Sequence, residues 1–297
     1  MQDNPMTRWL SVMAIAALIA ACGGDPGTKD KLTTEDPQND VQELRQKKSR
    51  NIFYSIPSPM ETAGMLKRAG AEYDSRIPND VKNVDRYTTA SKQALNLGIY
   101  GADLSYSSVF NQTQESMFYT SCAKRLAENL GVMGVFNEEV LERMERNVQD
   151  RDSLLNIIST TYWEADAYLK ENGRENISAL MITGGWVEGL YIATQVAAVK
   201  PSAELRQRVA EQRFSLNDLI GLVNTYPEDA TLDGPRADLQ ALQALFADVD
   251  QGTAGAEVKE ENGITVIGGG GTPPAITDEQ LTAIRDKAAE IRNAYIN

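Results

Sequence analysis

The strongest constraint on the fold is an apolar stretch at residues 177–199 that carries one acid, Glu188, at its centre. Its length fits a membrane span, because about 20 apolar residues cross a bilayer core. However, a central carboxylate costs about 2.5–3.5 kcal/mol on the insertion scale, and each Leu or Ile returns only about 0.3–0.6 kcal/mol. The glycines at 184, 185 and 189 add little to that return. We therefore interpret the stretch as the buried central helix of a bundle.

A second segment has a similar pattern. Residues 95–106 and 180–191 are both apolar, both contain glycine, and both place an acid three residues before a tyrosine. The two pairs are Asp103/Tyr106 and Glu188/Tyr191. Glycines one turn apart would let a neighbouring helix approach each segment closely, namely Gly98 and Gly101 in the first and Gly185 and Gly189 in the second. The likeness fits a duplicated helical unit, and it also fits chance because the match is short.

Most of the chain after residue 50 has helical patterning. Apolar residues recur every three or four positions, and Ser58–Glu61 and Thr277–Gln280 have the form of capping boxes. Near the C-terminus, Asn262-Gly263 is a favoured two-residue hairpin turn. We expect an all-α bundle of about nine helices over residues 51–297. A small β-hairpin at 255–267 and a Gly/Pro linker at 268–276 precede the last helix, which docks on its own bundle or on a partner.

The N-terminus has the features of a targeting segment, with translation beginning at Met1 or at Met6. Residues 9–21 form an apolar run that is too short for a membrane span, and Cys22 follows directly. The sequence Ile19-Ala20-Ala21-Cys22 resembles the lipobox of bacterial lipoproteins. The resemblance implies that residues 1–21 are a signal peptide and that Cys22 carries diacylglycerol and usually an amide-linked acyl chain such as palmitate. The alternatives are an ordinary cleaved signal with a chance cysteine and a buried apolar helix.

Residues 22–50 read as a flexible tether, because they contain too few aliphatic side chains to form a core. In the lipoprotein family an Asp directly after the Cys can hold the protein at the inner membrane. Gly23 at that position implies the outer membrane of a Gram-negative bacterium, and the body faces either the periplasm or the outside. The body also resembles helical lipoproteins of Bacteroidota, and this resemblance implies no activity.

The amino-acid composition excludes or disfavours several classes of function. The chain has no histidine, which excludes imidazole bases and histidine metal sites. Its net charge of −13 disfavours a nucleic-acid partner, because phosphate contacts need clustered Lys and Arg. Cys122 is the only other thiol and reads as inert packing. We expect no catalytic residue, no metal and no cofactor.

Asp103 and Glu188 are the best candidates for a site, because a buried unpaired carboxylate is costly and must be paired, hydrogen-bonded or protonated. One hypothesis places the two acids across a ligand pocket rimmed by aromatic side chains, which would suit a cationic or sugar-like ligand. Its members are Asp103, Tyr106, Trp186, Glu188 and Tyr191. The other hypothesis is that each acid is satisfied by a nearby Tyr, Arg or helix end and only completes the core.

Two functions follow from these hypotheses. The first is a non-enzymatic envelope lipoprotein, attached to the membrane through Cys22 and serving as a scaffold or accessory subunit for an envelope protein partner. The alternative is a ligand-binding lipoprotein that uses the acidic and aromatic residues around Asp103 and Glu188. An enzyme would have to work with carboxylates, Tyr, Lys or Ser alone.

Overall fold

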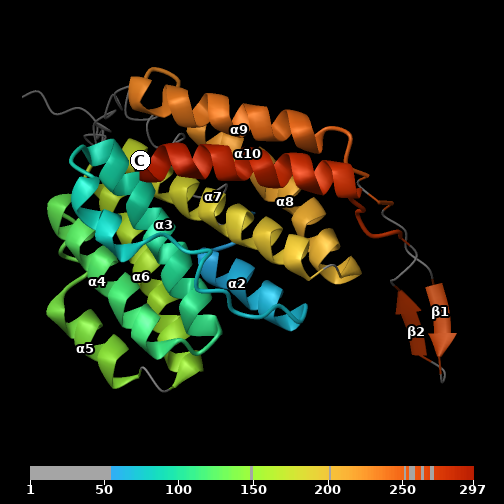
Figure 1. Cartoon of the computed structure of the whole chain (residues 1–297), viewed down its shortest axis with the longest axis horizontal. Helices are drawn as coiled ribbons and strands as arrows, with labels where there is room; N and C mark the ends of the chain where they lie inside the picture. Colours follow the sequence, from blue (N-terminus) through green and yellow to red (C-terminus); the bar gives the residue numbers. More distant parts are fainter. Residues whose placement is uncertain are drawn as a thin grey trace, which may run out of the picture.

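A computed structural model describes residues 55–147, 150–200, 202–250, 252–253, 258–261, 264–267 and 271–297. The signal peptide, Cys22 and the tether lie outside these residues. The described chain is helical, which confirms the expected fold class (Figure 1). The helices are α2 (Pro59–Arg68), α3 (Ala90–Val109), α4 (Thr113–Asn129), α5 (Glu138–Arg146), α6 (Arg151–Glu171), α7 (Glu175–Val199), α8 (Ala203–Val223), α9 (Asp233–Phe246) and α10 (Asp278–Ile296), with 3₁₀ turns η1 (Val81–Arg86) and η2 (Ala230–Leu232).

Local capping determines where the helices begin. Both predicted capping boxes are present, at Ser58 before α2 and at Thr277 before α10. In the first, the Glu61 N–H donates to Ser58 Oγ over 3.2 Å, and the Ser58 N–H donates to Glu61 Oε2 over 2.6 Å. These bonds satisfy backbone donors that have no partner within the first helical turn, so the sequence specifies the helix start locally.

Helix α7 is the centre of the bundle, as the apolar stretch predicted. It packs against α2, α3, α6, α8 and α10. It is also the one helix of the described chain that is long and apolar enough to cross a membrane. Its most apolar window is 94% buried inside the protein, so the neighbouring helices cover the surface that lipid would otherwise cover. Its hydrophobicity is therefore accounted for by the core.

Helices α3 and α7 interlock through glycines, and these are the two segments whose sequences resemble each other. A Cβ added to Gly98 would lie 1.9 Å from the Met181 carbonyl oxygen, and one added to Gly184 would lie 1.9 Å from the Leu95 oxygen. No side chain fits at either position, so the backbones touch directly. The predicted role in close approach is confirmed for Gly98.

The other predicted glycines contribute less to this contact. A Cβ on Gly185 would lie 3.2 Å from the Gly98 oxygen, and one on Gly189 would meet Thr62 of α2 at 3.5 Å. A Cβ on Gly101 would meet no atom within 4 Å, so Gly101 is not needed for the approach. The position of each glycine relative to the helix crossing decides its role, and one-turn spacing does not reveal that position.

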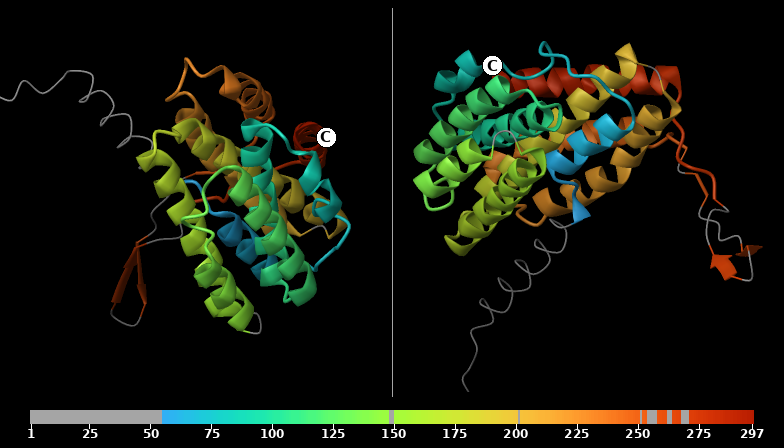
Figure 2. Two further views of the ribbon diagram at one scale, coloured as in Figure 1. Left: turned by 90° about the vertical axis from the view of Figure 1, so that its left-hand side faces the viewer. Right: turned by 90° about the horizontal axis from the view of Figure 1, so that it is seen from below.

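Helix α10 lies along one side of the bundle against α7, α9 and α3 (Figure 2). Its stripe of Leu281, Ile284, Ala288, Ile291 and Tyr295 is buried, so it docks on its own chain. The residues just before α10 are hydrogen-bonded to the residues just after α9. The Thr253 N–H donates to the Thr272 oxygen over 3.0 Å, and the Ala275 N–H donates to the Asp250 oxygen over 3.1 Å. These bonds close the base of the excursion between α9 and α10.

Two short strands lie within that excursion. Strand β1 (Val258–Glu261) runs antiparallel to β2 (Ile264–Ile267), with Val258 opposite Ile267 and Glu261 opposite Ile264. The predicted turn at 262–263 and the linker residues 268–270 lie outside the described residues. The hairpin as a connected unit therefore stays a prediction.

Candidate functional site

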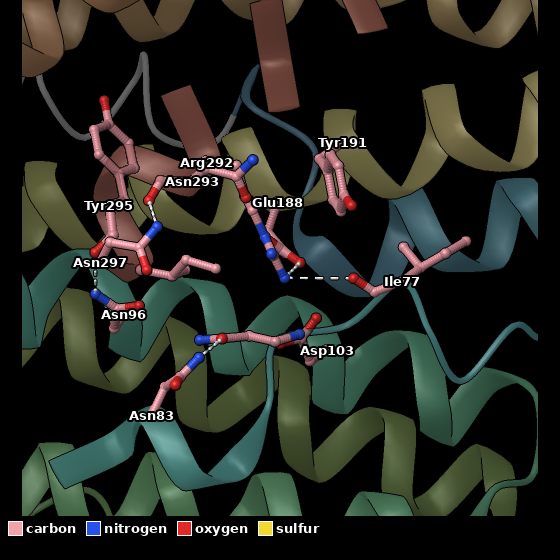
Figure 3. Close-up of polar contacts among 12 residues, drawn as sticks. Ile77, Asn83, Asn96, Asp103, Glu188, Tyr191, Arg292, Asn293, Tyr295 and Asn297 are labelled. Atoms are coloured by element: carbon pink, nitrogen blue, oxygen red, sulfur yellow. Dashed lines mark hydrogen bonds and ion pairs between the residues drawn. The ribbon is translucent and has the colours of Figure 1, made fainter. Parts of the chain in front are cut away.

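Asp103 of α3 and Glu188 of α7 lie together in the core, because the glycine contact brings their helices into register (Figure 3). Neither side chain is exposed to solvent. Glu188 is paired with Arg292 of α10, which is only 6% exposed. Arg292 Nε lies 3.0 Å from Glu188 Oε2, and Nη2 lies 3.2 Å from Oε1. This bidentate pair joins the central helix to α10, and such geometry is the strong form of a carboxylate–guanidinium contact.

The guanidinium has two further contacts. Arg292 Nη2 donates to the Ile77 carbonyl oxygen over 3.4 Å. Its central carbon lies 4.8 Å from the centroid of the Tyr191 ring, so the ring face covers the cation. Tyr191 is partly exposed and separates the ion pair from solvent on that side. Tyr191 thus lies at the cluster, where its ring contacts Arg292.

Asp103 has a poorer set of partners than Glu188. Its Oδ2 accepts the Asn79 N–H over 3.1 Å, whereas its Oδ1 is buried without a hydrogen-bond partner. Burial raises the pKa of Asp103 well above its ordinary value, the Glu188 carboxylate raises it further, and Arg292 opposes both effects. Burial also raises the pKa of Glu188, while Arg292 acts to lower it. The two acids therefore favour holding protons more than exposed carboxyl groups do.

A buried network continues from Asn79 to the end of α10. Asn79 Nδ2 donates to Tyr87 Oη over 3.0 Å, and Tyr87 Oη donates to the Ile296 oxygen over 3.4 Å. Asn96 Nδ2 donates to the Tyr295 oxygen over 3.0 Å. The last carbonyls of a helix have no partner within the helix. Side chains from the core satisfy two of them here, so these hydrogen bonds and the ion pair both hold the C-terminal part of α10.

Tyr106 and Trp186 use their polar atoms elsewhere. Tyr106 Oη donates to the Glu72 oxygen over 3.2 Å and accepts the Asp74 N–H over 3.0 Å. Trp186 Nε1 donates to Ser215 Oγ of α8 over 2.9 Å. The structure thus brings Asp103, Glu188 and Tyr191 into one cluster with Arg292, and it directs the polar atoms of Tyr106 and Trp186 to other partners.

Hollows of the described protein lie elsewhere, two of them beside α2. An apolar cavity of about 30 Å³ sits between α2, α3, α4, α6 and α7, with Gly101, Leu104, Tyr162 and Met181 among its lining residues. A groove of about 750 Å³ runs beside α2, past Met60, Lys67 and Arg68. None of the five sequence-predicted pocket residues lines either hollow. The small cavity has room for little more than a water molecule or two.

Cys122 is buried on α4, with its Sγ 3.8 Å from the Val81 oxygen. Burial raises the pKa of its thiol to about 12, so the thiol stays protonated and unreactive at neutral pH. This agrees with the interpretation of Cys122 as inert packing. Within the described residues, no three Cys, Asp or Glu side chains gather in a way that would hold a metal ion.

Sequence reasoning missed Arg292 and Asn79. The burial of Arg292 could have been predicted from the sequence. Arg292 follows Ile284 and Ala288 at four-residue spacing and therefore shares the buried face of α10. A cation on the apolar face of a helix indicates a buried anion as its partner. Asn79 left no signal, because it contributes a backbone N–H from an irregular segment.

Comparisons with known protein families, with curated proteins and with solved structures gave no match.

Proposed function

We propose that this chain is a lipid-anchored helical module of a bacterial envelope, serving as a scaffold or accessory subunit of a membrane complex. The anchor rests on Ile19-Ala20-Ala21-Cys22 at the end of a short apolar run. Several acyl chains on Cys22 would hold the protein at the bilayer more firmly than one chain does. Gly23 after the cysteine favours the outer membrane.

One observation carries the scaffold role over the ligand-binding role, namely the pairing of Glu188 with Arg292 from the same chain. Both side chains are buried, and the guanidinium occupies the position that a cationic ligand would take beside the acid. The charges of the central helices therefore hold α10 in place. A module of this kind would offer its outer surface to a partner.

A second candidate, binding of a small polar ligand, is favoured by the free Oδ1 of Asp103 and the partly exposed Tyr191 beside the cluster. A ligand there would enter past Tyr191 and displace part of the Arg292 contact. The hydrogen bonds of Tyr106 and Trp186 to protein partners weigh against a wide pocket.

We also propose that β1 and β2 form a hairpin through Asn262-Gly263, since the antiparallel pairing leaves two residues between them. The hairpin would extend the surface between α9 and α10.

The anchor is tested by growing cells with labelled palmitate and fractionating them. We expect the wild-type chain to be labelled and to follow the membranes, and Cys22→Ala to lose both properties. Cys122→Ala is the matched control, because its buried thiol is the only other cysteine and should not affect labelling. An unlabelled wild-type chain, or a Cys22→Ala chain that still fractionates with membranes, would contradict the proposal.

The scaffold role is tested by in-cell crosslinking of the lipidated wild-type protein, followed by identification of the crosslinked envelope proteins. We expect a specific protein partner that is lost from the Cys22→Ala strain, since the unanchored chain leaves the membrane surface. Recovery of the chain without any protein partner, together with a tightly bound small molecule in native mass spectra, would favour the ligand-binding role instead.

A further inference from the structure

The buried cluster of Asp103, Glu188 and Arg292 has an unbalanced charge. It holds two carboxyl groups, both fully buried, and one guanidinium that is 6% exposed. If both acids were ionised, the cluster would carry a net negative charge out of reach of water. An uncompensated buried charge costs several kcal/mol, so the cluster needs one more positive charge or one proton.

The groups that face the pair do not supply a second cation within the described residues. Apart from Arg292 of α10, they are phenols, a thiol and an amide from the 71–89 segment, α3, α4 and α7. On the 71–89 segment these are Tyr73, Asn79 and Tyr87, on α3 Tyr100, on α4 Tyr119 and Cys122, and on α7 Tyr191. Burial raises the pKa of each of these tyrosines and of the thiol, so they stay neutral and cannot change the balance near neutral pH.

The hydrogen bonds indicate where the missing positive charge belongs. Glu188 has both oxygens on the guanidinium, whereas Asp103 has one oxygen on a backbone N–H and one, Oδ1, without a partner. A bare carboxylate oxygen in the core is unfavourable because it is an acceptor without a donor. Protonation makes that oxygen a hydroxyl group, which can donate to the Glu188 carboxylate, and removes the negative charge of Asp103.

We propose that Asp103 and Glu188 together hold one exchangeable proton in the folded chain, and that its loss loosens α10 from the bundle. On dissociation the proton passes to water, and the two acids become like charges on adjacent helices. Their repulsion acts on the groups that hold them, which are the Asn79 N–H and Arg292 of α10. Water that enters past Tyr191 relieves the repulsion and separates α10 from α7.

The direction of the pH dependence follows from linkage. With α10 docked, burial and the Glu188 charge raise the pKa of Asp103, whereas in an open state it returns to an ordinary 3.8. Opening therefore releases a proton, and the opening equilibrium constant rises with pH. The rise is at most about tenfold per pH unit, starting near pH 4 and ending at the pKa of the docked state.

The test is hydrogen exchange of the full chain in detergent, followed by mass spectrometry between about pH 5 and about pH 8 and corrected for the intrinsic exchange rate. In the wild type we expect protection of α10 to fall as the pH rises, while α5 (Glu138–Arg146), which does not touch the cluster, serves as the internal reference. In Asp103→Asn, which is neutral at every pH, we expect protection of α10 to stay constant. Equal slopes in the two proteins would overturn the proposal.

Infrared spectra of the wild type add a readout that does not require the variant to fold. The proposal expects a carboxylic-acid C=O band that persists at neutral pH, in a protein whose exposed acids are all ionised. In Asp103→Asn that band should be lost. A wild-type spectrum with every carboxyl group ionised at neutral pH, or a band that Asp103→Asn leaves unchanged, would show that the cluster holds no proton.

Discussion

Helices α3 and α7 carry nearly the same short pattern, yet their acids and tyrosines end in different situations. Glu188 of α7 meets a guanidinium, whereas Asp103 of α3 meets one backbone N–H. Tyr106 of α3 is fully buried and bridges Glu72 and Asp74, whereas Tyr191 of α7 is partly exposed over Arg292. The difference comes from what packs on each helix. At Asp103 and Tyr106 the irregular residues 72–79 lie against α3, and at Glu188 and Tyr191 the amphipathic α10 lies against α7.

This comparison separates two questions about a buried polar residue. Its own chemistry determines that it needs a partner, and the element packed against it determines which partner it finds. A segment with free backbone groups satisfies Tyr106 well and Asp103 poorly. Helix α10, through the long side chain of Arg292, satisfies Glu188, and the ring of Tyr191 lies over the guanidinium. Substitutions at the glycines, the acids and the tyrosines test each part of this contrast.

The largest effect on stability is expected from adding a side chain where the backbones of α3 and α7 touch. Gly98→Ala or Gly184→Ala would place a methyl group 1.9 Å from a backbone carbonyl oxygen, so the helices must separate. We expect each to lower the free energy of unfolding by about 4–5 kcal/mol, the upper range for a point substitution. Urea denaturation followed by circular dichroism measures the loss. A loss below about 1 kcal/mol would mean that the helices do not touch at these positions.

The next effect contrasts the two acids. Glu188→Gln removes the carboxylate that is hydrogen-bonded to Arg292 and leaves Asp103, which has no hydrogen bond to the guanidinium, as the remaining acid of the cluster. We expect it to lower the free energy of unfolding by about 3–5 kcal/mol. Asp103→Asn keeps an oxygen for the Asn79 N–H, and we expect a change within about 1 kcal/mol at mildly acidic pH. Parallel denaturant titrations measure both. Equal losses in the two variants would contradict the asymmetry between the acids.

The two tyrosines should differ less in their effect on stability than the two acids do, and here the larger loss is expected on α3 instead of α7. Tyr106→Phe removes the hydroxyl group that pairs the Glu72 oxygen and the Asp74 N–H, and we expect a loss of about 1–3 kcal/mol. Tyr191→Phe keeps an aromatic face over Arg292, so we expect a loss below about 0.5 kcal/mol. Thermal unfolding of the pair by calorimetry ranks them. A larger loss in Tyr191→Phe would reverse the assignment.

The smallest effect is a gain in stability. Gly101 lies in α3 one turn from Gly98, but a Cβ there meets no atom within 4 Å and points toward the apolar cavity that Gly101 lines. Gly101→Ala should raise the free energy of unfolding by about 0.5–1 kcal/mol, because alanine loses less backbone entropy in a helix. Gly101→Ala is the matched control for Gly98→Ala. A large loss of stability in Gly101→Ala would show that α3 tolerates no added methyl group.

The helical class was predictable because its signals are local. The spacing of apolar residues and the caps at Ser58 and Thr277 depend on neighbours within one turn, so the sequence expresses them directly. The central position of α7 was predictable from a carboxylate inside an apolar run. In contrast, the sequence does not show that Gly184 lies at the helix contact, because the face on which two helices cross is decided by the whole bundle.

The candidate site was predictable in part. Burial of Asp103 and Glu188 followed from their apolar surroundings, and an arginine partner was one of the alternatives. The identity of that partner was not predictable from the two helices, because Arg292 lies 104 residues from Glu188. The polar partners of Tyr106 and Trp186 were not predictable either, since the hydroxyl group of Tyr106 bonds to backbone groups of an irregular segment and the indole of Trp186 bonds to Ser215 of α8.

The distance along the chain between Glu188 and Arg292 has a consequence for biosynthesis. Synthesis delivers α3 and α7 first, and 104 residues separate Glu188 from the guanidinium that neutralises it. If α3 and α7 pack before α10 arrives, their two acids lack the guanidinium and stay hydrated, so we expect the partly folded chain to be more sensitive to proteases than the complete bundle. Docking of α10 brings Arg292 to the acids and completes their burial.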